Sequence, residues 1–427
     1  MYFFFFSNLK AATIHDFQTE RFINDIVNII NKANNYENKI IFSIILDDEP
    51  NAFVNEDNKL FISTGLLKYT ESYEALIGVL SHEIGHIDNF HISKRKNSLK
   101  KLNNLNNLTN LSLIAGSLVS NKSDYLIQSL ITNKIGINNY FQSFSRDQER
   151  EADYYAIETL NKLQLSKKPL IKFLNLLEKK SQLSGINDEY RKFSSHPIYK
   201  ERYDIILNTK NQKDNNFNKK IDNRFKYIKA KIFGFTENDM GTVKQYLSND
   251  YITYAESIIL SKEGKLKESF YLLNALLKKK QNYNFLLETK ADILYSAGFF
   301  TEALLFYEKS ILYNPYNHYV SKRIFDLKFS LLDLKNKNIS LELFNDYSFL
   351  IEIFINDKIL KNKFKKLASE GNIIKWNNYF SNEEKFYKKQ ITKKDLKKNM
   401  AEIKNTTFDN NLIKLINKYL IDINEDI

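Results

Sequence analysis

The chain has 427 residues, with 63 Lys and Arg against 51 Asp and Glu, and therefore a formal net charge of +12. Its hydrophobic content of 43% excludes a disordered protein, and its length is sufficient for two or three domains. The chain has no cysteine, which excludes disulfides and thiolate metal sites, so any metal must be bound by histidine and carboxylate side chains.

The positive charge is distributed along the chain among Asn and Ile residues and is not gathered in one arm. This distribution favours a solvated basic surface, and we expect no nucleic-acid partner. The chain has 11 glycines and lacks the glycine runs that bind phosphates, which argues against a nucleotide-dependent enzyme.

The amino terminus, MYFFFFSNLKAAT, begins with an apolar run followed by small and polar residues. Two interpretations are open: residues 1–11 are the end of a secretory signal peptide that lacks its basic region, or they form an ordinary apolar strand or helix. Elsewhere no uninterrupted apolar run reaches the roughly 18 residues of a membrane span, so we expect a soluble or peripheral protein.

Helical and strand-like segments alternate over the next part of the chain. DFQTERFINDIVNIINKANN, residues 16–35, has apolar residues at helical spacing and ends in an Asn pair. KIIFSIILDD, residues 39–48, and KLFISTGLL, residues 59–67, predict two strands. EPNAFVNEDN, residues 49–58, predicts the turn between them.

The segment SYEALIGVLSHEIGHIDNFHISK, residues 72–94, predicts one long helix that carries three of the six histidines of the chain. His82 and His86 are four residues apart, so they project from one helix face and can bind one metal ion. Glu83 lies beside them, where it can take a proton from an attacking water. Zinc catalysis commonly uses three protein ligands, so two histidines alone do not make a site.

His91 does not fit as the third ligand. In the elongated motif HExxHxxGxxH, a glycine and a histidine follow the second ligand by three and six residues, and this chain has Asn89 and Ile92 there. We therefore expect the third ligand to be a carboxylate on another helix.

The segment SRDQEREADYYAIETL, residues 145–160, predicts that second helix. Glu149 and Asp153 are four residues apart on one face. Glu149 can bind the metal, and Asp153 can accept the free ring N–H of a ligand histidine. We interpret three further charged residues of this segment as surface or helix-pairing charges: Arg146, Arg150 and Glu151.

The apolar stretches of residues 101–144, between the two helices, are broken by Asn, Ser and Lys and are too short to span a bilayer. Two interpretations are open. The segment is an amphipathic hairpin that lies on a membrane or caps the site, or it is a plain pair of packed helices.

A 34-residue repeat follows. EGKLKESFYLLNALLKKKQNYN, from Glu263, aligns with AGFFTEALLFYEKSILYNPYN, from Ala297, so that Gly264 matches Gly298. This is the period of tetratricopeptide repeats, which stack into a solenoid with a concave surface for peptides or partner proteins. Because three or more units are usually needed for stability, we expect degenerate repeats or capping helices over residues 320–427.

Three segments, NAFVNEDNKLFISTGLL, EALIGVLSHEIGHIDNFH and SRDQEREAD, together resemble the M48 family of zinc metallopeptidases over residues 12–208. The resemblance implies a mainly α (α+β) domain with a small sheet. It implies one zinc ion bound by His82, His86 and Glu149, with Glu83 as the base. It also assigns Asn51, Ala52 and Phe53 to an edge strand that pairs with an extended substrate.

A fourth segment, SSHPIYKER, residues 194–202, resembles the periplasmic, repeat-bearing branch of that family. The resemblance implies that His196 lies close to the metal, where it blocks or assists the reaction, and that Arg202 stabilises an oxyanion. By itself, His196 before Pro197 is as readily a residue at the start of a helix.

The resemblance implies a periplasmic zinc endopeptidase that acts on misfolded or misassembled envelope proteins, especially outer-membrane ones, and binds a protein partner through its repeats. Two alternatives are open: a chaperone-like, zinc-stabilised scaffold with a latent protease site, and a cytoplasmic or membrane-peripheral peptidase. The predicted regions are a signal remnant over 1–11, the metallopeptidase domain over 12–208, connecting helices over 209–245, repeats over 246–335 and a helical region over 336–427.

Overall fold

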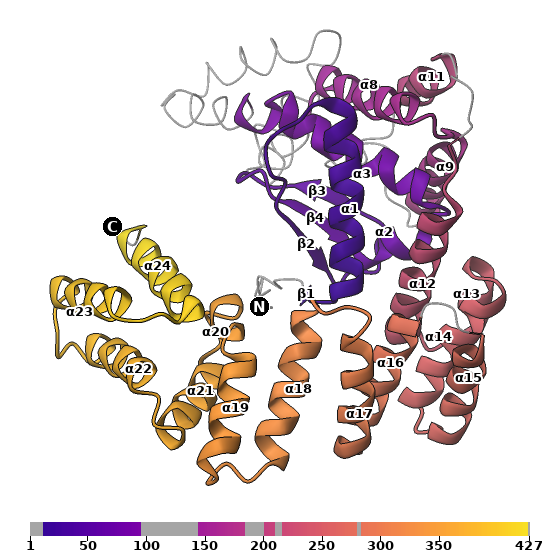
Figure 1. Cartoon of the computed structure of the whole chain (residues 1–427). Helices are drawn as coiled ribbons and strands as arrows, with labels where there is room; N and C mark the ends of the chain where they lie inside the picture. Colours follow the sequence, from indigo (N-terminus) through magenta and orange to yellow (C-terminus); the bar gives the residue numbers. More distant parts are fainter. Residues whose placement is uncertain (1–11, 95–143, 184–199, 210–215, 280–282, 426–427) are drawn as a thin grey trace, which may run out of the picture. The chain divides into compact units, whose positions relative to one another are not determined.

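The structure, a computed structural model, describes residues 12–94, 144–183, 200–209, 216–279 and 283–425 (Figure 1). The chain divides into two compact units, Met1–Leu272 and Leu273–Ile427. The proposed signal remnant, the segment 101–143 and His196 lie outside the described residues.

The first unit is mainly helical and contains one small sheet. Its elements, in chain order, are β1 (Thr13–Ile14), α1 (Phe17–Asn34), β2 (Phe42–Ile45), β3 (Ala52–Val54), β4 (Leu60–Ser63), α2 (Thr64–Tyr69), α3 (Tyr73–Asp88), α8 (Arg146–Lys162), α9 (Lys168–Leu183), α11 (Lys200–Asn208), α12 (Lys219–Thr236), α13 (Met240–Tyr246) and α14 (Asn249–Lys262). Helix α15 (Leu266–Lys278) begins in this unit and ends in the second.

The sheet has the strand order β1-β2-β4-β3. β2 and β4 pair in parallel, and β1 and β3 pair with them antiparallel, so β3 is an outer strand. The prediction of a plain turn over residues 49–58 is therefore wrong. Its residues Ala52–Val54 form β3, where Phe53 pairs with Phe61 and stacks on it, and the turn is confined to residues 55–58.

The predicted strand over residues 59–67 is also too long. Ser63 ends β4 and caps α2, because its hydroxyl oxygen accepts a hydrogen bond from the backbone N–H of Leu66 at 3.0 Å. Lys68 of α2 is 1% exposed and forms ion pairs with Asp48 and Glu237. These contacts connect the sheet region to the chain that follows α12.

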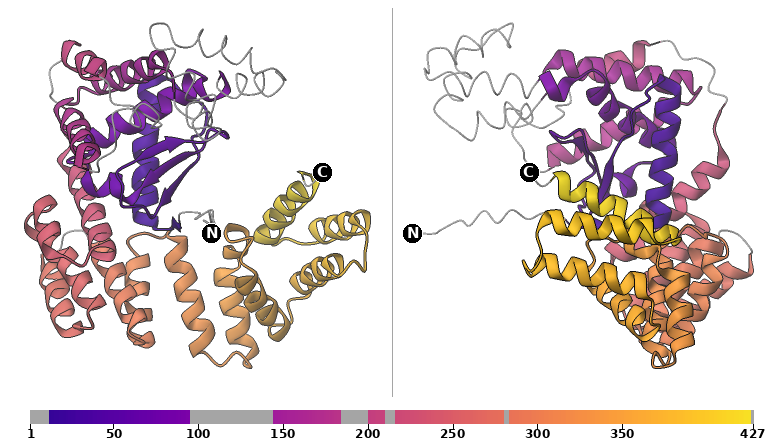
Figure 2. Two further views of the ribbon diagram at one scale, coloured as in Figure 1. Left: turned by 180° about the vertical axis from the view of Figure 1, so that it is seen from behind. Right: turned by 60° about the vertical axis from the view of Figure 1, so that its left-hand side comes forward.

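The predicted helix over residues 16–35 is confirmed as α1. Its side chains Phe22, Ile23, Ile26 and Ile30 are buried, and it lies across one face of the sheet, as Figure 1 and the view from behind in Figure 2 agree. Phe22 stacks on Phe225 of α12 at 5.7 Å between ring centroids, so α12 also contributes to this core.

The predicted long helix over residues 72–94 is interrupted. Helix α3 ends at Asp88, and Phe90 adopts a left-handed conformation with φ 59°. A short helical turn, residues 91–94, follows. A non-glycine residue rarely takes a positive φ, and directly after it His91 Nδ1 lies 2.9 Å from Nδ1 of His86 on α3.

Lys229 of α12 is buried, and its ammonium donates a hydrogen bond to the carbonyl of Thr70 at 3.0 Å. Burial lowers the pKa of Lys229 to about 8, while Glu71 opposes this shift and Lys226 adds to it. The charged form therefore costs stability below pH 8. Above pH 8 the folded protein loses this proton before the unfolded chain does, so stability rises with pH up to about 10.5.

Lys229→Met should consequently stabilise the protein at pH 7 by roughly 1 to 2 kcal/mol, because it keeps the apolar stem and removes the buried charge. Urea unfolding at pH 7 and pH 9.5 measures this. The advantage of the variant should shrink at the higher pH, and a variant less stable than the wild type at pH 7 would contradict the argument.

The second unit consists of helices that pack one after another. Its helices are α16 (Tyr283–Ser296), α17 (Phe300–Ile311), α18 (His318–Leu331), α19 (Lys337–Tyr347), α20 (Leu350–Ile353), α21 (Lys358–Glu370), α22 (Ile374–Tyr387), α23 (Lys393–Asn405) and α24 (Asn410–Glu425). Successive helices are in contact from α16 to α19 and again from α21 to α24, with α19 against α21. This is a solenoid-like arrangement.

An aromatic core stabilises the second half of this unit. Phe325 stacks on Phe364 at 4.3 Å, and Phe344 contacts both Phe364 and Trp376 edge-on. The indole of Trp376 is 1% exposed and donates a hydrogen bond to Asp409 at 2.7 Å. The helices of residues 336–427 therefore share one hydrophobic core, although no repeat consensus is readable there.

The two turns of the sequence repeat have the same conformation. Gly264, between α14 and α15, has φ 78°, and Gly298, between α16 and α17, has φ 83°. Both values favour glycine, which has no Cβ to clash. The assignment of these helices to tetratricopeptide repeats stays a prediction.

None of the helices in the described part of the chain combines the length and the apolar character that a membrane span requires.

Candidate metal centre

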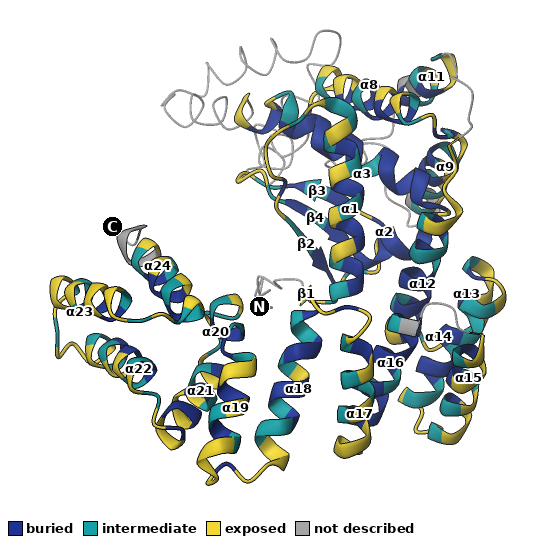
Figure 3. Cartoon of the chain, in the orientation of Figure 1, coloured by how far each residue is buried: buried dark blue, intermediate teal, exposed yellow. Residues whose placement is uncertain are grey.

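Helix α3 places the HEIGH motif in the interior of the first unit. It is buried along almost its whole length (Figure 3), and His82, Glu83 and His86 are 5%, 2% and 0% exposed. Burying three such groups is unfavourable unless they have partners, so their surroundings determine what the site can do.

Helix α8 packs against α3 and carries Glu149 in its first turn. A capping box fixes the start of this helix: the Ser145 hydroxyl accepts from the Gln148 N–H, and the Gln148 side chain accepts from the Ser145 N–H. Gly85 allows close contact, because a Cβ there would lie 3.0 Å from Cβ of Tyr155 and 3.3 Å from Cα of Ala152.

Three predicted ligands converge across this helix interface. His82 Nε2 lies 3.1 Å from His86 Nε2 and 3.4 Å from a carboxylate oxygen of Glu149, and His86 Nε2 lies 3.5 Å from the other oxygen. Ligand atoms about 2.0 to 2.2 Å from a tetrahedral zinc ion lie about 3.3 to 3.6 Å from one another. The three groups therefore lie close enough together to hold one metal ion, at distances near those of a tetrahedral zinc site.

The charges at the site also suit a divalent cation. Three buried carboxylates, those of Glu83, Glu149 and Asp153, surround one buried guanidinium, that of Arg202. Counted as ionised, these four groups carry a net charge of −2. Buried charge of one sign is costly without compensation, and a dication would neutralise it.

Asp153 holds His82 from the side away from the other ligands. Its Oδ1 lies 2.9 Å from His82 Nδ1, and Arg202 donates to both carboxylate oxygens, each at 2.8 Å. The remaining guanidinium nitrogen, Nη1, lies 3.5 Å from Glu149. Arg202 thus anchors the carboxylate partner of a ligand, and its predicted role at an oxyanion stays a prediction.

The pKa values follow from these contacts. Burial alone would raise the pKa of Asp153, but Arg202 and His82 lower it below its usual range. Burial and Arg202 lower the pKa of His82, but its hydrogen bonds to Asp153 and Glu149 outweigh them and raise it. The pKa of Arg202 is also raised, because Asp153 and Glu149 outweigh its burial. Asp153 is therefore a stable carboxylate acceptor for the N–H of His82.

His91 and Glu151, which the sequence does not assign to the metal centre, form a chain of contacts with the predicted ligand His86. His91, excluded as a ligand, is fully buried, and its Nδ1 lies 2.9 Å from His86 Nδ1. Its Nε2 lies 2.9 Å from Glu151, which we had interpreted as a surface or helix-pairing charge. Phe144 stacks on the ring of His86 at 3.7 Å. No local sequence pattern predicts the contact between His91 and Glu151. It depends on the left-handed conformation of Phe90 and on the packing of α8 against α3.

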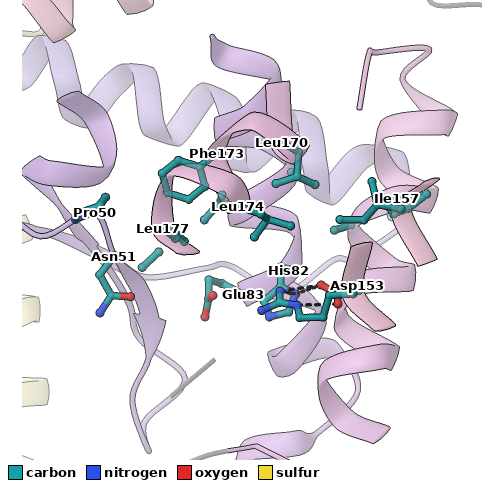
Figure 4. A pocket seen from close by; sticks show the side chains of 16 residues that line it. Pro50, Asn51, His82, Glu83, Asp153, Ile157, Leu170, Phe173, Leu174 and Leu177 are labelled. Carbon is teal, nitrogen blue, oxygen red and sulfur yellow. Dashed lines mark hydrogen bonds and ion pairs between the residues drawn. The ribbon is translucent and has the colours of Figure 1, made fainter. Parts of the chain in front are cut away.

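A cavity of about 70 Å³ opens beside His82 and Glu83 (Figure 4). Figure 4 shows Glu83 between His82 and Asn51. The apolar side chains of Leu170, Phe173 and Leu174 lie above them in this view. The apolar lining comes mainly from α3, α8, α9 and α11: Gly78, Val79, Ala156, Ile157, Leu170, Phe173, Leu174, Leu177 and Ile206.

The predicted substrate-binding residues lie at one border of this cavity. Asn51 and Ala52 line it, at the start of the outer strand β3. Phe53 instead packs on Phe61 within the sheet. Substrate pairing along β3 stays a prediction.

Residues 17–210 match the family model described as Peptidase family M48. Two relatives carry the name beta-barrel assembly-enhancing protease. The chain is 23% identical to that of Yersinia pestis over 298 residues, which are 66% of this chain and 60% of that protein. It is 22% identical to that of Escherichia coli K12 over 204 residues, 48% of this chain and 41% of that protein. The chain thus spans about half the length of these relatives.

Proposed function

Residues 17–210 of this chain belong to peptidase family M48, and from this premise we propose that the protein is a zinc-dependent endopeptidase. The observation that carries the proposal is the convergence of His82, His86 and Glu149 at zinc-like spacing, with Glu83 beside them on the same helix.

A zinc ion held by these three ligands would supply a Lewis acid that polarises the scissile carbonyl. The protein's own residues do the remaining work. Glu83 accepts the proton of the attacking water and delivers it to the leaving amine. Asp153, held by Arg202, fixes the tautomer and the orientation of His82.

The site suits an extended, unfolded polypeptide. The outer strand β3 borders the cavity and offers backbone groups for pairing with a substrate strand. The apolar lining beside Glu83 can take an apolar side chain of the same segment. Segments with exposed backbone and exposed apolar side chains are typical of unfolded chains, so misfolded proteins are the proposed substrates.

The names of the two relatives support a role in the bacterial envelope. We propose that the protein acts in the periplasm on misassembled envelope proteins, particularly outer-membrane proteins. The helices of the second unit are proposed to bind a substrate or a protein partner. Contact with a membrane surface is a further proposal, and nucleic acid is not a proposed partner.

The test combines metal analysis with cleavage of unfolded casein by the purified full chain. We expect one zinc ion per chain, loss of cleavage with a chelator, and recovery when zinc is added. Cleavage that persists in the metal-free protein would refute the proposal. A zinc-loaded protein that cleaves nothing, even as His196→Ala, would favour the alternative of a zinc-stabilised scaffold.

A further inference from the structure

We propose that His91 and Glu151 form a positioning relay that fixes the ring and the tautomer of the ligand His86. The proposal rests on the proposed metal site and adds two residues to it. It is carried by two hydrogen bonds of 2.9 Å, one from His86 Nδ1 to His91 Nδ1 and one from His91 Nε2 to Glu151.

When both imidazoles are neutral, the two bonds have one consistent assignment of protons. An ionised carboxylate only accepts hydrogen bonds, so Glu151 requires the proton on His91 Nε2. A neutral His91 then has a lone pair on Nδ1, which must accept a hydrogen bond from the N–H at His86 Nδ1. The remaining ring nitrogen of His86, Nε2, is left with a lone pair, and this is the atom that faces His82 and Glu149. The carboxylate of Glu151 therefore sets the ligand atom of His86 through one intervening imidazole.

The surroundings maintain this arrangement. His91 is fully buried, so water does not compete for either of its ring nitrogens. Glu151 has a side chain that is 55% exposed, which allows an ionised carboxylate at low cost. Phe144 covers the ring of His86 with an interplanar angle of 17°, which restricts its rotation.

The relay parallels the contact made by the other ligand histidine. His82 Nδ1 contacts the buried carboxylate of Asp153 directly. For His86 the carboxylate is one imidazole further away, because His91 lies between them. Such partners of metal-binding histidines raise metal affinity, and their loss typically weakens binding about 10- to 100-fold.

The experiment measures the zinc dissociation constant of the full chain by competition with a chromophoric chelator. His91→Ala should weaken binding about 10- to 100-fold. His91→Gln, whose side-chain carbonyl can still accept from His86, should recover part of the affinity. Because a variant of the buried His91 can fail to fold, Glu151→Ala is the second test, and about tenfold weaker binding is expected.

Glu158→Ala is the matched control, since Glu158 lies on the same helix, is 66% exposed and pairs with Lys162. It should bind zinc as the wild type does. Equal affinities of Glu151→Ala and Glu158→Ala would overturn the relay while leaving the proposed peptidase intact. A wild-type protein that binds no zinc would overturn the metal site and the relay together.

Discussion

Replacing Glu83 with glutamine should lower kcat/KM for an unfolded substrate by about 10²- to 10⁴-fold. The amide has nearly the shape of the carboxylate, but it cannot take a proton from water at neutral pH. Glu83 lines the cavity beside His82, and it is the one carboxylate of α3 among the residues that line this cavity. Initial rates of cleavage of a labelled unfolded protein measure the effect.

The loss should be confined to the chemical step. Glu83→Gln is expected to retain the zinc content and the thermal unfolding temperature of the wild type. Glu71→Gln is a suitable control, because Glu71 is an exposed acid just before α3 that pairs with Lys172. If Glu83→Gln kept more than a tenth of the wild-type rate, Glu83 would not be the base.

Asp153→Ala should lower the free energy of unfolding by about 3 to 5 kcal/mol, because it leaves the guanidinium of Arg202 buried without its bidentate partner. Arg202 is 7% exposed, so water screens the remaining charge poorly. Urea unfolding of the metal-free full chain at pH 7 measures this cost separately from zinc binding.

A double variant separates the pair from its surroundings. Asp153→Ala with Arg202→Met removes both charges, and it should lose clearly less than the sum of the two single variants. Strictly additive losses would show that Asp153 and Arg202 stabilise the protein independently, contrary to the geometry of their hydrogen bonds.

The residues that converge at the candidate metal centre could be predicted because their spacing along each helix is local. His82 and His86 share a helix face by periodicity alone, and so do Glu149 and Asp153 on the second helix. The structure adds that the two faces converge. The structure confirms the predicted mainly helical fold with a small sheet. This fold could be predicted because long amphipathic segments form most of it.

Local propensity fails for two features that depend on contacts between distant segments, although the family resemblance assigns residues 51–53 to an edge strand. Strand β3 has three residues and exists through its pairing with β4, while the flanking Pro50 and Asn55 favour a turn. The position of His91 depends on a left-handed Phe90, a conformation that phenylalanine seldom adopts. Local propensity predicts neither.

The packing of α3, including its close approach to α8, restricts the residues that can occupy the two unspecified positions of HExxH. HExxH specifies three letters and leaves two unspecified, yet in this chain neither unspecified position is free. Ile84 is fully buried in the core, and at Gly85 even one added carbon would meet α8. A Gly85→Ala chain would still match the motif, with every ligand in place along the sequence. The added Cβ would nevertheless require α8, which carries Glu149, to shift by a few tenths of an ångström from the helix that carries His82 and His86. His82, Glu83 and His86 supply the chemical groups of the motif. Ile84 and Gly85 fit the close packing around α3, including its contact with α8.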